Sequence, residues 1–265
     1  RKLVGDITVE TLAKILRMIS LKKIPSYNKY LPKGAPKIKI PPKMESDLTV
    51  VYFPSCINRA MGVSIDYSEN EALVEKVLNV LQKAKVNVVF PEDKEKLCCG
   101  MAFNSKGFVE IGDYKAKELE EALLKASNNG EYPILCDMSP CLYRMKETLT
   151  KKLRLYDPIK FSLEFLVDRL EFKKLPITIA LHNVCSSTKM GLNEDFKKLA
   201  SFCVEKVCVP ENVGCCGWAG DRGFTYPELN QSALKHLTKE AISDAIAGYS
   251  TSRTCEIGLT LKTDL

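Results

Sequence analysis

The sequence predicts an α/β protein made of two duplicated units, each with a parallel sheet flanked by helices. Two observations support this prediction. Short β-branched runs alternate with helical patterns in the order β-α-β-α-β, which favours parallel strands joined by helices. The same order occurs twice, and in each copy a cysteine, a Cys-Cys-Gly triplet and a further cysteine come after successive strands or in loops at their carboxyl ends. An internal duplication explains both observations.

Composition narrows the classes of protein to consider. The chain has 265 residues, of which 45% are hydrophobic and 27% charged, enough for a sizeable core. The net charge of +6 comes without long runs of one sign, so we expect no nucleic-acid partner. No apolar stretch approaches the ~18–20 residues of a transmembrane segment, and no signal peptide opens the chain. We expect a cytoplasmic protein, and leave open a peripheral position at the inner face of the cell membrane.

Eleven cysteines are the unusual feature of the composition. An odd number that includes two adjacent pairs fits poorly with a secreted disulfide framework. In a reducing compartment, thiolates more often bind metal or do redox work. The cysteines therefore predict a metal or redox site.

Residues 1–47 predict a docking helix and a linker. Within residues 1–20 the pattern is that of an amphipathic helix, with one apolar face formed by Val9, Leu12, Ile15, Leu16 and Ile19. From Pro25 to Pro42 the chain is rich in proline and lysine, and each proline removes a hydrogen-bond donor and restricts its predecessor. We expect this stretch to wrap over the protein without regular structure.

The first unit is predicted to span residues 48–151. Its expected strands are Leu48–Pro54, Val86–Phe90 and Tyr132–Leu135, and its expected helices cover Asn70–Lys85 and Gly112–Ala126. Cys56 follows the first strand, Cys98-Cys99-Gly100 follow the second, and Cys141 closes the unit.

The second unit is predicted to span residues 152–265. It begins with a helical pattern at Ser162–Leu170, and its expected strands are Ile177–Leu181 and Lys206–Pro210, with a helix at Glu194–Val204 between them. A long helix is expected at about Pro227–Ala247, followed by Gly248–Ser252 and Cys255. Cys185 and Cys215-Cys216-Gly217 occupy the places of the first unit's cysteines.

Each unit should bring four thiolates to one site, because an open parallel sheet places its ligands at the carboxyl ends of its strands. Soft thiolates select iron–sulfur clusters, zinc or cuprous copper, and four of them suit a [4Fe–4S] cluster or a tetrahedral zinc. We predict up to two [4Fe–4S] clusters, with zinc as the alternative. The predicted ligands are Cys56, Cys98, Cys99 and Cys141 in the first unit, and Cys185, Cys215, Cys216 and Cys255 in the second.

Other residues are weighed against a structural role. We expect Cys203 and Cys208 to pack as small hydrophobic side chains, and Cys136 to favour packing over ligation. His182 is expected to be structural, with a role as a ligand, a proton carrier or a hydrogen-bond donor to a cluster as the alternative. Trp218 either shields a cluster from water or only anchors its loop by packing. Arg59, Arg222 and Arg253 also lie near predicted ligands, where a cation stabilises thiolates, but ordinary salt bridges explain them as well. No phosphate-binding loop or catalytic triad stands out, so no catalytic residue is assigned.

Three strings carry a resemblance to a known family: HNVCSSTKMG at 182–191, GCCGWAGDRGF at 214–224 and STSRTCEIGL at 250–259. With them, residues 48–265 resemble the cysteine-rich CCG domain family. That family occurs in heterodisulfide reductase B subunits, in iron–sulfur subunits of glycolate oxidase and anaerobic glycerol-3-phosphate dehydrogenase, and in lactate-utilisation proteins. The strings look most like the C-terminal part of FAD-linked D-lactate dehydrogenases.

The resemblance implies an electron relay. In that family, FAD in an upstream domain or partner oxidises a 2-hydroxy acid, and electrons pass through clusters to an acceptor such as a quinone or cytochrome. The chain contains neither an FAD domain nor a ferredoxin-type cysteine run, so we do not expect it to oxidise lactate alone. Met138 and Ser252 stand where the family's fullest pattern has a fifth cysteine. Two alternatives remain: a thiolate–zinc or metal-free docking scaffold, and thiol–disulfide chemistry like that of heterodisulfide reductases.

Overall fold

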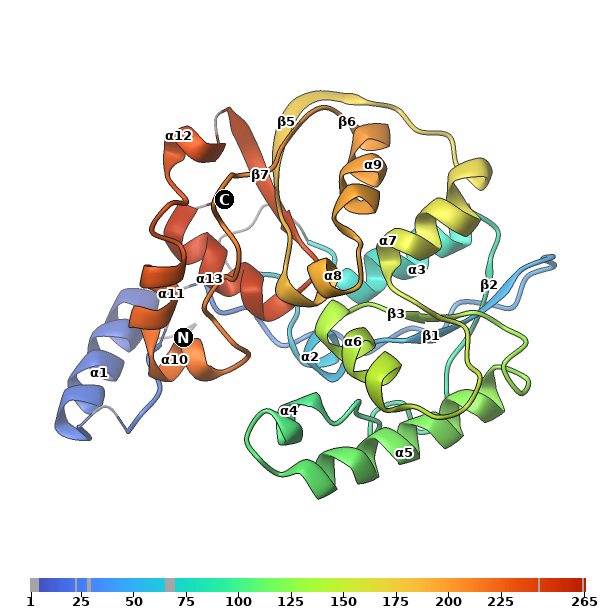
Figure 1. Cartoon of the computed structure of the whole chain (residues 1–265), viewed down its shortest axis with the longest axis horizontal. Coiled ribbons are helices and arrows are strands. Elements are labelled where there is room, and N and C mark those ends of the chain that lie inside the picture. The colour runs from blue at the N-terminus through green and yellow to red at the C-terminus, as the bar shows by residue number, and fades with distance from the viewer. Residues whose placement is uncertain (1–4, 22, 28–29, 65–69, 243, 264) are drawn as a thin grey trace.

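The computed structural model describes residues 5–21, 23–27, 30–64, 70–242, 244–263 and 265. Two parallel sheets, one in each half of the chain, form the framework, and helices cover both faces of each (Figure 1). This is the α/β architecture of duplicated parallel sheets that the sequence predicts. No helix among the described residues is long and apolar enough to cross a bilayer.

The first sheet has the strand order β2-β1-β3-β4, and every pair is parallel. Its strands are β1 (Thr49–Phe53), β2 (Asn87–Val89), β3 (Ile134–Cys136) and β4 (Leu155–Tyr156). The connecting helices are α2 (Cys56–Ala60), α3 (Leu73–Lys83), α4 (Met101–Asn104), α5 (Val109–Ala126) and α6 (Ser139–Thr148).

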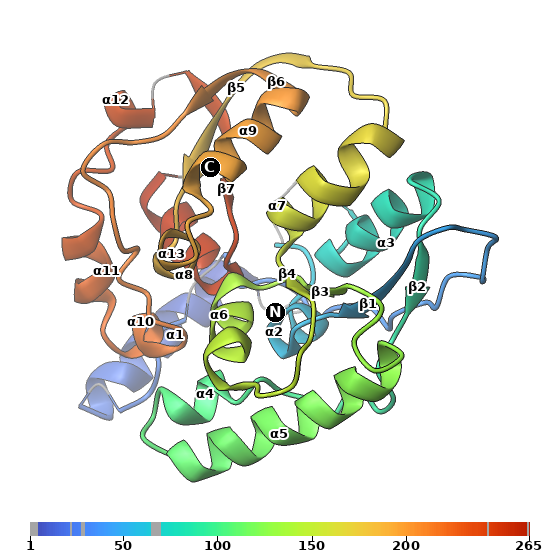
Figure 2. The same ribbon diagram turned by 45° about the vertical axis from the view of Figure 1, so that its right-hand side comes forward.

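The sequence of β1 is an unbroken apolar run because both faces of the first sheet are buried. Alternate side chains of a strand point to opposite faces, so Val51 and Phe53 pack beneath α5 and α6, while Val50 and Tyr52 pack beneath α3. Figure 2 shows α5 and α6 on one side of this sheet and α3 on the other.

The second sheet repeats the arrangement with the order β6-β5-β7, again fully parallel. Its strands are β5 (Leu175–His182), β6 (Val204–Cys208) and β7 (Ala245–Ser250), and its helices include α8 (Cys185–Lys189), α9 (Asn193–Cys203) and α13 (Arg253–Thr263). In both sheets the first strand in the chain lies in the centre, with the second on one side and the third on the other. The duplication is therefore visible in the topology as well as in the sequence.

The prediction of a long helix at Pro227–Ala247 is wrong. The chain instead forms α10 (Arg222–Thr225), α11 (Pro227–Ala233), α12 (Lys239–Ile242) and then strand β7. The alanine-rich run around residue 245 has high helix propensity, but its backbone pairs with β5 from Thr178 to His182. Completing the second sheet outweighs the local preference for helix.

The segment between the sheets contains α7 (Pro158–Phe161), the π-helical turn η1 (Ser162–Leu166) and the 3₁₀ turn η2 (Val167–Arg169). The helical stretch thus begins four residues before the predicted Ser162, where the Asp157 side chain accepts a hydrogen bond from the Lys160 backbone N–H at 2.8 Å. β4 adds to the first sheet, and Phe161 and Leu166 pack in the same core as α3. The division of the chain at residue 152 stays a prediction.

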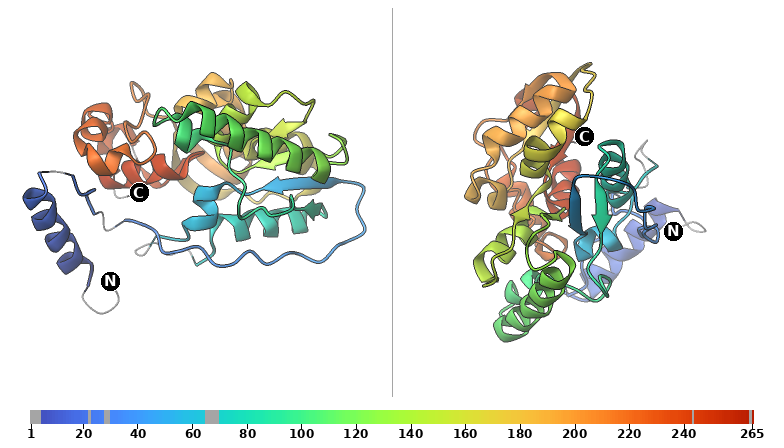
Figure 3. Two further views of the ribbon diagram at one scale, coloured as in Figure 1. Left: turned by 90° about the horizontal axis from the view of Figure 1, so that it is seen from below. Right: turned by 90° about the vertical axis from the view of Figure 1, so that its right-hand side faces the viewer.

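The N-terminal part runs along both units (Figure 3). α1 covers Asp6–Ile19, and the following stretch has no regular structure among its described residues except one bridge between Gly34 and Met61. Ser26 donates its backbone N–H to Phe224 O at 2.6 Å, and Lys33 O accepts from the Gly62 N–H at 2.7 Å, so the stretch contacts both units. The parts of these predictions on residues 1–4, 22 and 28–29 lie outside the described residues.

The glycine of each Cys-Cys-Gly triplet has a conformation that other residues rarely adopt. Gly100 has φ +80° and Gly217 has φ +68°. A Cβ atom at Gly100 would overlap the Gly112 carbonyl of α5, and one at Gly217 would overlap the Leu229 carbonyl of α11. These two glycines therefore let the first cysteine pair sit directly against α5 and the second directly against α11.

Gly100→Ala should lower the free energy of unfolding of the metal-free protein by more than about 2 kcal/mol, because backbone strain and a steric clash add together. Gly107→Ala is the matched control, since Gly107 has φ +87° but open space around it. The control should cost only about 1 kcal/mol of strain. Urea unfolding of both variants measures this, and equal losses would contradict the close packing of Gly100 on α5.

Candidate metal centres

The predicted ligands occupy equivalent places in the two units. Cys56 and Cys185 are the first residues of α2 and α8, just after the central strands β1 and β5. The two Cys-Cys pairs lie in the loops after β2 and β6, and Cys141 and Cys255 lie in the first turns of α6 and α13, after β3 and β7. All eight therefore stand at the carboxyl edge of their own sheet, as expected for ligands in this type of fold.

In the first unit the four sulfurs form a connected group. The thiols of Cys56 and Cys99 interact with the Cys98 sulfur, which accepts the Gly100 backbone N–H at 3.4 Å. Cys99 in turn interacts with Cys141. The interactions with the Cys56 and Cys99 thiols lower the pKa of Cys98 well below its ordinary value, with a smaller contribution from the Arg59 charge. Cys98 is thus the sulfur of this group most stabilised as a thiolate.

In the second unit the sulfurs form two contacting pairs. Cys216 Sγ lies 2.9 Å from Cys255 Sγ, and Cys185 interacts with Cys215, which accepts the Gly217 N–H at 3.3 Å. The hydrogen bond from Cys255 lowers the pKa of Cys216 to about 7. Burial, followed by the contact with Cys215, raises the pKa of Cys185 to about 11. The charge of Cys216 also acts on Cys185, which links the two pairs.

The structure therefore brings together both predicted groups of four cysteines. Within the described ranges, however, no three His, Cys, Asp or Glu side chains surround one point as ligands of a single metal ion. The thiols of each group interact with one another instead, so side-chain rotations would be needed to open a space between them. Such rotations are available to the exposed Cys56, Cys185 and Cys215.

The two sites differ in exposure to solvent. Cys99 and Cys141 are buried in the first unit, whereas only Cys216 is buried in the second. A cavity of about 390 Å³ adjoins Cys185 and Cys215 and is also lined by His182 and Asn183. The second site is consequently the more open of the two.

Hydrogen bonds between matching positions hold the ligand loops together. In the first unit, Asn58 Nδ2 donates to Asp137 O at 3.3 Å. In the second, Ser187 Oγ and Thr251 Oγ1 lie 2.6 Å apart. Both pairs join the residue two places after the first cysteine to the residue four places before the last. These residues were not singled out from the sequence, but their equal offsets from the cysteines were a signal that could have found them.

In the first unit, the buried side chain of Asp137 adds further hydrogen bonds between these loops. Its carboxylate accepts hydrogen bonds from Tyr52 Oη at 2.7 Å and from the Ser55 backbone N–H at 2.8 Å. Burial raises the pKa of Asp137, and these donors oppose the shift. Because Ser55 directly precedes Cys56, Asp137 ties the loop of the first cysteine to the loop of the last.

Buried polar groups without a partner test whether a metal centre fits. Such atoms are rare in folded proteins and usually mark a missing water, ion or ligand. Among the described residues, all but one of them lie on residues within three positions of a predicted ligand, the exception being Asp157. Several of these unpartnered groups are N–H groups, which can donate hydrogen bonds to thiolate and sulfide sulfurs. These N–H groups belong to Arg59, Arg144, Trp218 and Arg253. The two sites therefore fit an anionic group that carries sulfur.

The cysteines outside the two groups lie in different environments. Cys136 is fully buried in the core that contains Cys99 and Cys141, as expected for packing. Cys208 is half-buried, and its thiol donates to Ala241 O at 3.3 Å. The expectation that Cys203 packs inside is wrong: it is the last residue of α9 and is exposed, so its thiol reaches only Leu199 O of its own helix.

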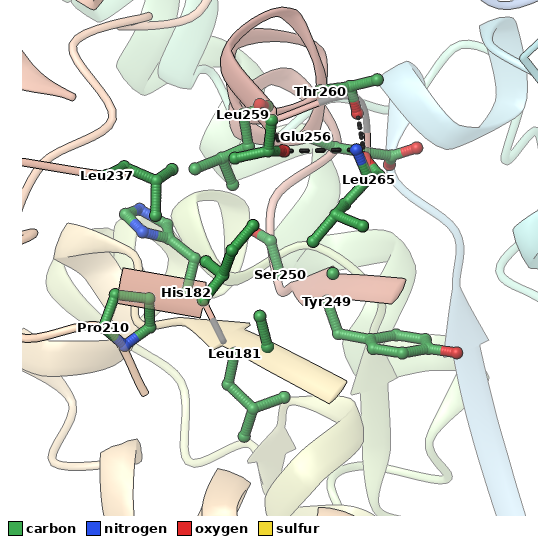
Figure 4. A pocket seen from close by; sticks show the side chains of 14 residues that line it. Leu181, His182, Pro210, Leu237, Tyr249, Ser250, Glu256, Leu259, Thr260 and Leu265 are labelled. Carbon is green, nitrogen blue, oxygen red and sulfur yellow. Dashed lines mark hydrogen bonds between the residues drawn. The ribbon is translucent and has the colours of Figure 1, made fainter. Parts of the chain in front are cut away.

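His182 is buried, with only 7% of its surface exposed, and its Nε2 has no partner among the described residues. Burial lowers its pKa to about 4, so the ring is neutral at physiological pH. It lines a second cavity of about 50 Å³ with Pro210 and Leu237 (Figure 4). Its position at the end of β5, between two cavities, is compatible with the structural role expected for it.

Comparison with known proteins agrees with the site geometry. The chain is 25% identical over 177 residues to lactate utilization protein A 1 of Bacillus mycoides (strain KBAB4), covering 62% of this chain and 71% of that protein. It is 24% identical over 186 residues to one of the subunits of the anaerobic glycerol-3-phosphate dehydrogenase of Escherichia coli (strain K12). That match covers 65% of this chain but only 47% of the relative, so the chain spans about half of that protein.

A protein-family model matches part of the chain. The model of the cysteine-rich domain CCG matches residues 50–146, which include β1 to β3 and the four cysteines of the first unit. The resemblance to the CCG family inferred from the cysteine motifs is therefore confirmed over residues 50–146, the part of the chain that this model matches.

Proposed function

We propose that the chain is the iron–sulfur electron-transfer module of an FAD-linked 2-hydroxy-acid dehydrogenase of the D-lactate or glycolate type. In this proposal each group of four cysteines holds one [4Fe–4S] cluster. The module relays electrons from a flavin domain or subunit to an acceptor such as a quinone or cytochrome. The single observation that carries the proposal is the convergence of Cys56, Cys98, Cys99 and Cys141 at one edge of a parallel sheet.

The unpartnered N–H groups favour a cluster over zinc. A zinc ion bound by four thiolates offers only those thiolates as hydrogen-bond acceptors, whereas a cluster adds inorganic sulfides. Arg59 has two buried nitrogens without a partner, and its charge acts on Cys56 and Cys98. A cluster in this position would satisfy donors that four thiolates around one ion would leave unpaired.

The relatives support an oxidoreductase and a partner. One relative is named as part of a dehydrogenase, and another is named for lactate utilization. An electron-transfer module needs a donor that performs the substrate chemistry, and no catalytic constellation stands out in the sequence of this chain. A flavin dehydrogenase domain or subunit is therefore the proposed partner.

Anaerobically prepared protein should be brown and contain about four irons per occupied site. Replacing Cys98 and Cys99 by Ser should remove the first cluster, and replacing Cys215 and Cys216 by Ser should remove the second. Each double variant should lose about half of the iron, because the two sites use separate ligands. Cys203→Ser is the control and should keep the full iron content. Metal analysis with electron paramagnetic resonance (EPR) measures this, and a colourless protein with about one zinc per chain would instead establish the scaffold alternative.

Arg59→Gln should lower the midpoint potential of the first cluster by about 40 mV, the one-electron equivalent of roughly 1 kcal/mol. The direction follows because reduction adds negative charge, which the nearby guanidinium stabilises. Arg169→Gln is a suitable control, since Arg169 pairs with Asp47 near the amino end of β1, at the opposite edge of the sheet. Potentiometric titration followed by EPR gives both values. An unchanged potential in Arg59→Gln would show that this arginine does not face the cluster.

A further inference from the structure

The last ligand loops of the two units meet at the centre of the molecule. Met138 lies in the turn between β3 and α6, and Ser139 is the first residue of α6. Thr251 and Ser252 lie in the turn between β7 and α13, and Arg253 is the first residue of α13. Ser139 donates its backbone N–H to Thr251 O at 3.1 Å, and the two hydroxyl oxygens lie 2.9 Å apart. Figures 1 and 2 show α6 and α13 converging here beside α8. We call the contact of residues 138–139 with residues 251–253 the junction.

Met138 and Arg253 form the second contact across the junction. The Arg253 backbone N–H points at Met138 Sδ at 3.4 Å, and the Arg253 guanidinium donates to Gly62 O in the first unit. Met138 itself packs in the core that contains Cys99 and Cys141. The contact therefore links the core around the first site to the helix that carries Cys255.

A third element joins at the same place. Ser186 Oγ donates to Ser139 Oγ at 2.9 Å, and Ser187 Oγ lies 2.6 Å from Thr251 Oγ1. Both serines follow Cys185 directly at the start of α8. Ser139 and Ser187 are no more than 1% exposed, while Thr251 is half-buried. The junction thus connects loops of three predicted ligands, Cys141, Cys185 and Cys255, through buried and half-buried hydrogen bonds.

Each unit also contributes a methionine to the core of the other. Met61, five residues after Cys56, packs against the core of Cys216 and Trp218. Met190, five residues after Cys185, packs against the core of Cys99 and Cys141. This reciprocal packing shows that the two sites share one packed interface.

We propose that the junction is the passage by which electrons move between the two sites, so that they act as a coupled pair. The inference rests on the proposed function. Each event moves one electron and no proton: one site is oxidised by one electron, and the other is reduced by one. Cys141 lies two positions beyond Ser139, and Cys255 two positions beyond Arg253, so the route is mostly covalent and crosses the interface through short contacts.

The test compares the EPR spectrum of the fully reduced protein with the spectra of its halves. Wild-type protein is reduced with dithionite beside two variants, one with Cys98 and Cys99 replaced by Ser and one with Cys215 and Cys216 replaced by Ser. The proposal expects the wild-type spectrum to be broader than the sum of the two variants and to relax faster, because two nearby spins interact. A wild-type spectrum equal to that sum would overturn the proposal, while iron in both variants would leave the proposed function standing.

A stepwise reduction of the wild type gives the same answer without variants that could misfold. At partial reduction most molecules carry one spin and should give the simple signal, and at full reduction the broadened signal should replace it. A signal that only grows, without changing shape, would overturn the coupling. Protein without iron would instead overturn the proposed function.

A junction variant tests the route itself. Ser139→Ala removes the hydroxyl that contacts Thr251 and Ser186, and should weaken the spin interaction while iron content stays at the wild-type value. Ser201→Ala is the matched control, because Ser201 is exposed and bonds only within α9. An interaction as strong in Ser139→Ala as in the control would show that the junction does not carry the coupling.

Discussion

The rest of this structure depends on one constraint, which is that the parallel strands of each sheet all end at the same edge. Because β1, β2 and β3 run in one direction, the loops that follow them open on the same side, and cysteines more than forty residues apart meet there. The second sheet repeats this with β5, β6 and β7. The sulfurs converge because of topology, and the glycine after each Cys-Cys pair lets the loop approach α5 in the first unit and α11 in the second.

Convergence alone would give two separate sites, and the interface makes them neighbours. In each site a hydrogen bond joins the position two residues after the first cysteine to the position four residues before the last, yet the residues at these positions differ between the units. Asp137 in the first unit binds within its own unit, through Tyr52 and Ser55. Thr251 in the second unit binds Ser187 in its own unit and Ser139 in the other. The position that Asp137 occupies in the first unit is thus occupied in the second unit by Thr251, which contacts the other unit.

Much of this arrangement could be predicted from the sequence, and the failures have physical causes. The repeated strand pattern and cysteine spacing were enough to predict parallel sheets and the two groups of cysteines, because periodicity and topology act locally on each unit. The strand β7 was hidden in a run with high helix propensity, since only its pairing with β5 reveals it. The roles of Asp137, Thr251 and Met190 were invisible because they depend on contacts between distant segments. Cys203 was misplaced because a helical pattern does not say which side of the last turn faces solvent.

The most direct test of the account is the mass of the intact chain under non-denaturing, anaerobic conditions. Native mass spectrometry of the reconstituted protein should show a species heavier than the metal-free chain by two [4Fe–4S] units, with a minor species carrying one. A chain that keeps its metal-free mass, or gains only the mass of zinc, would contradict the claim that the eight cysteines gather to hold clusters.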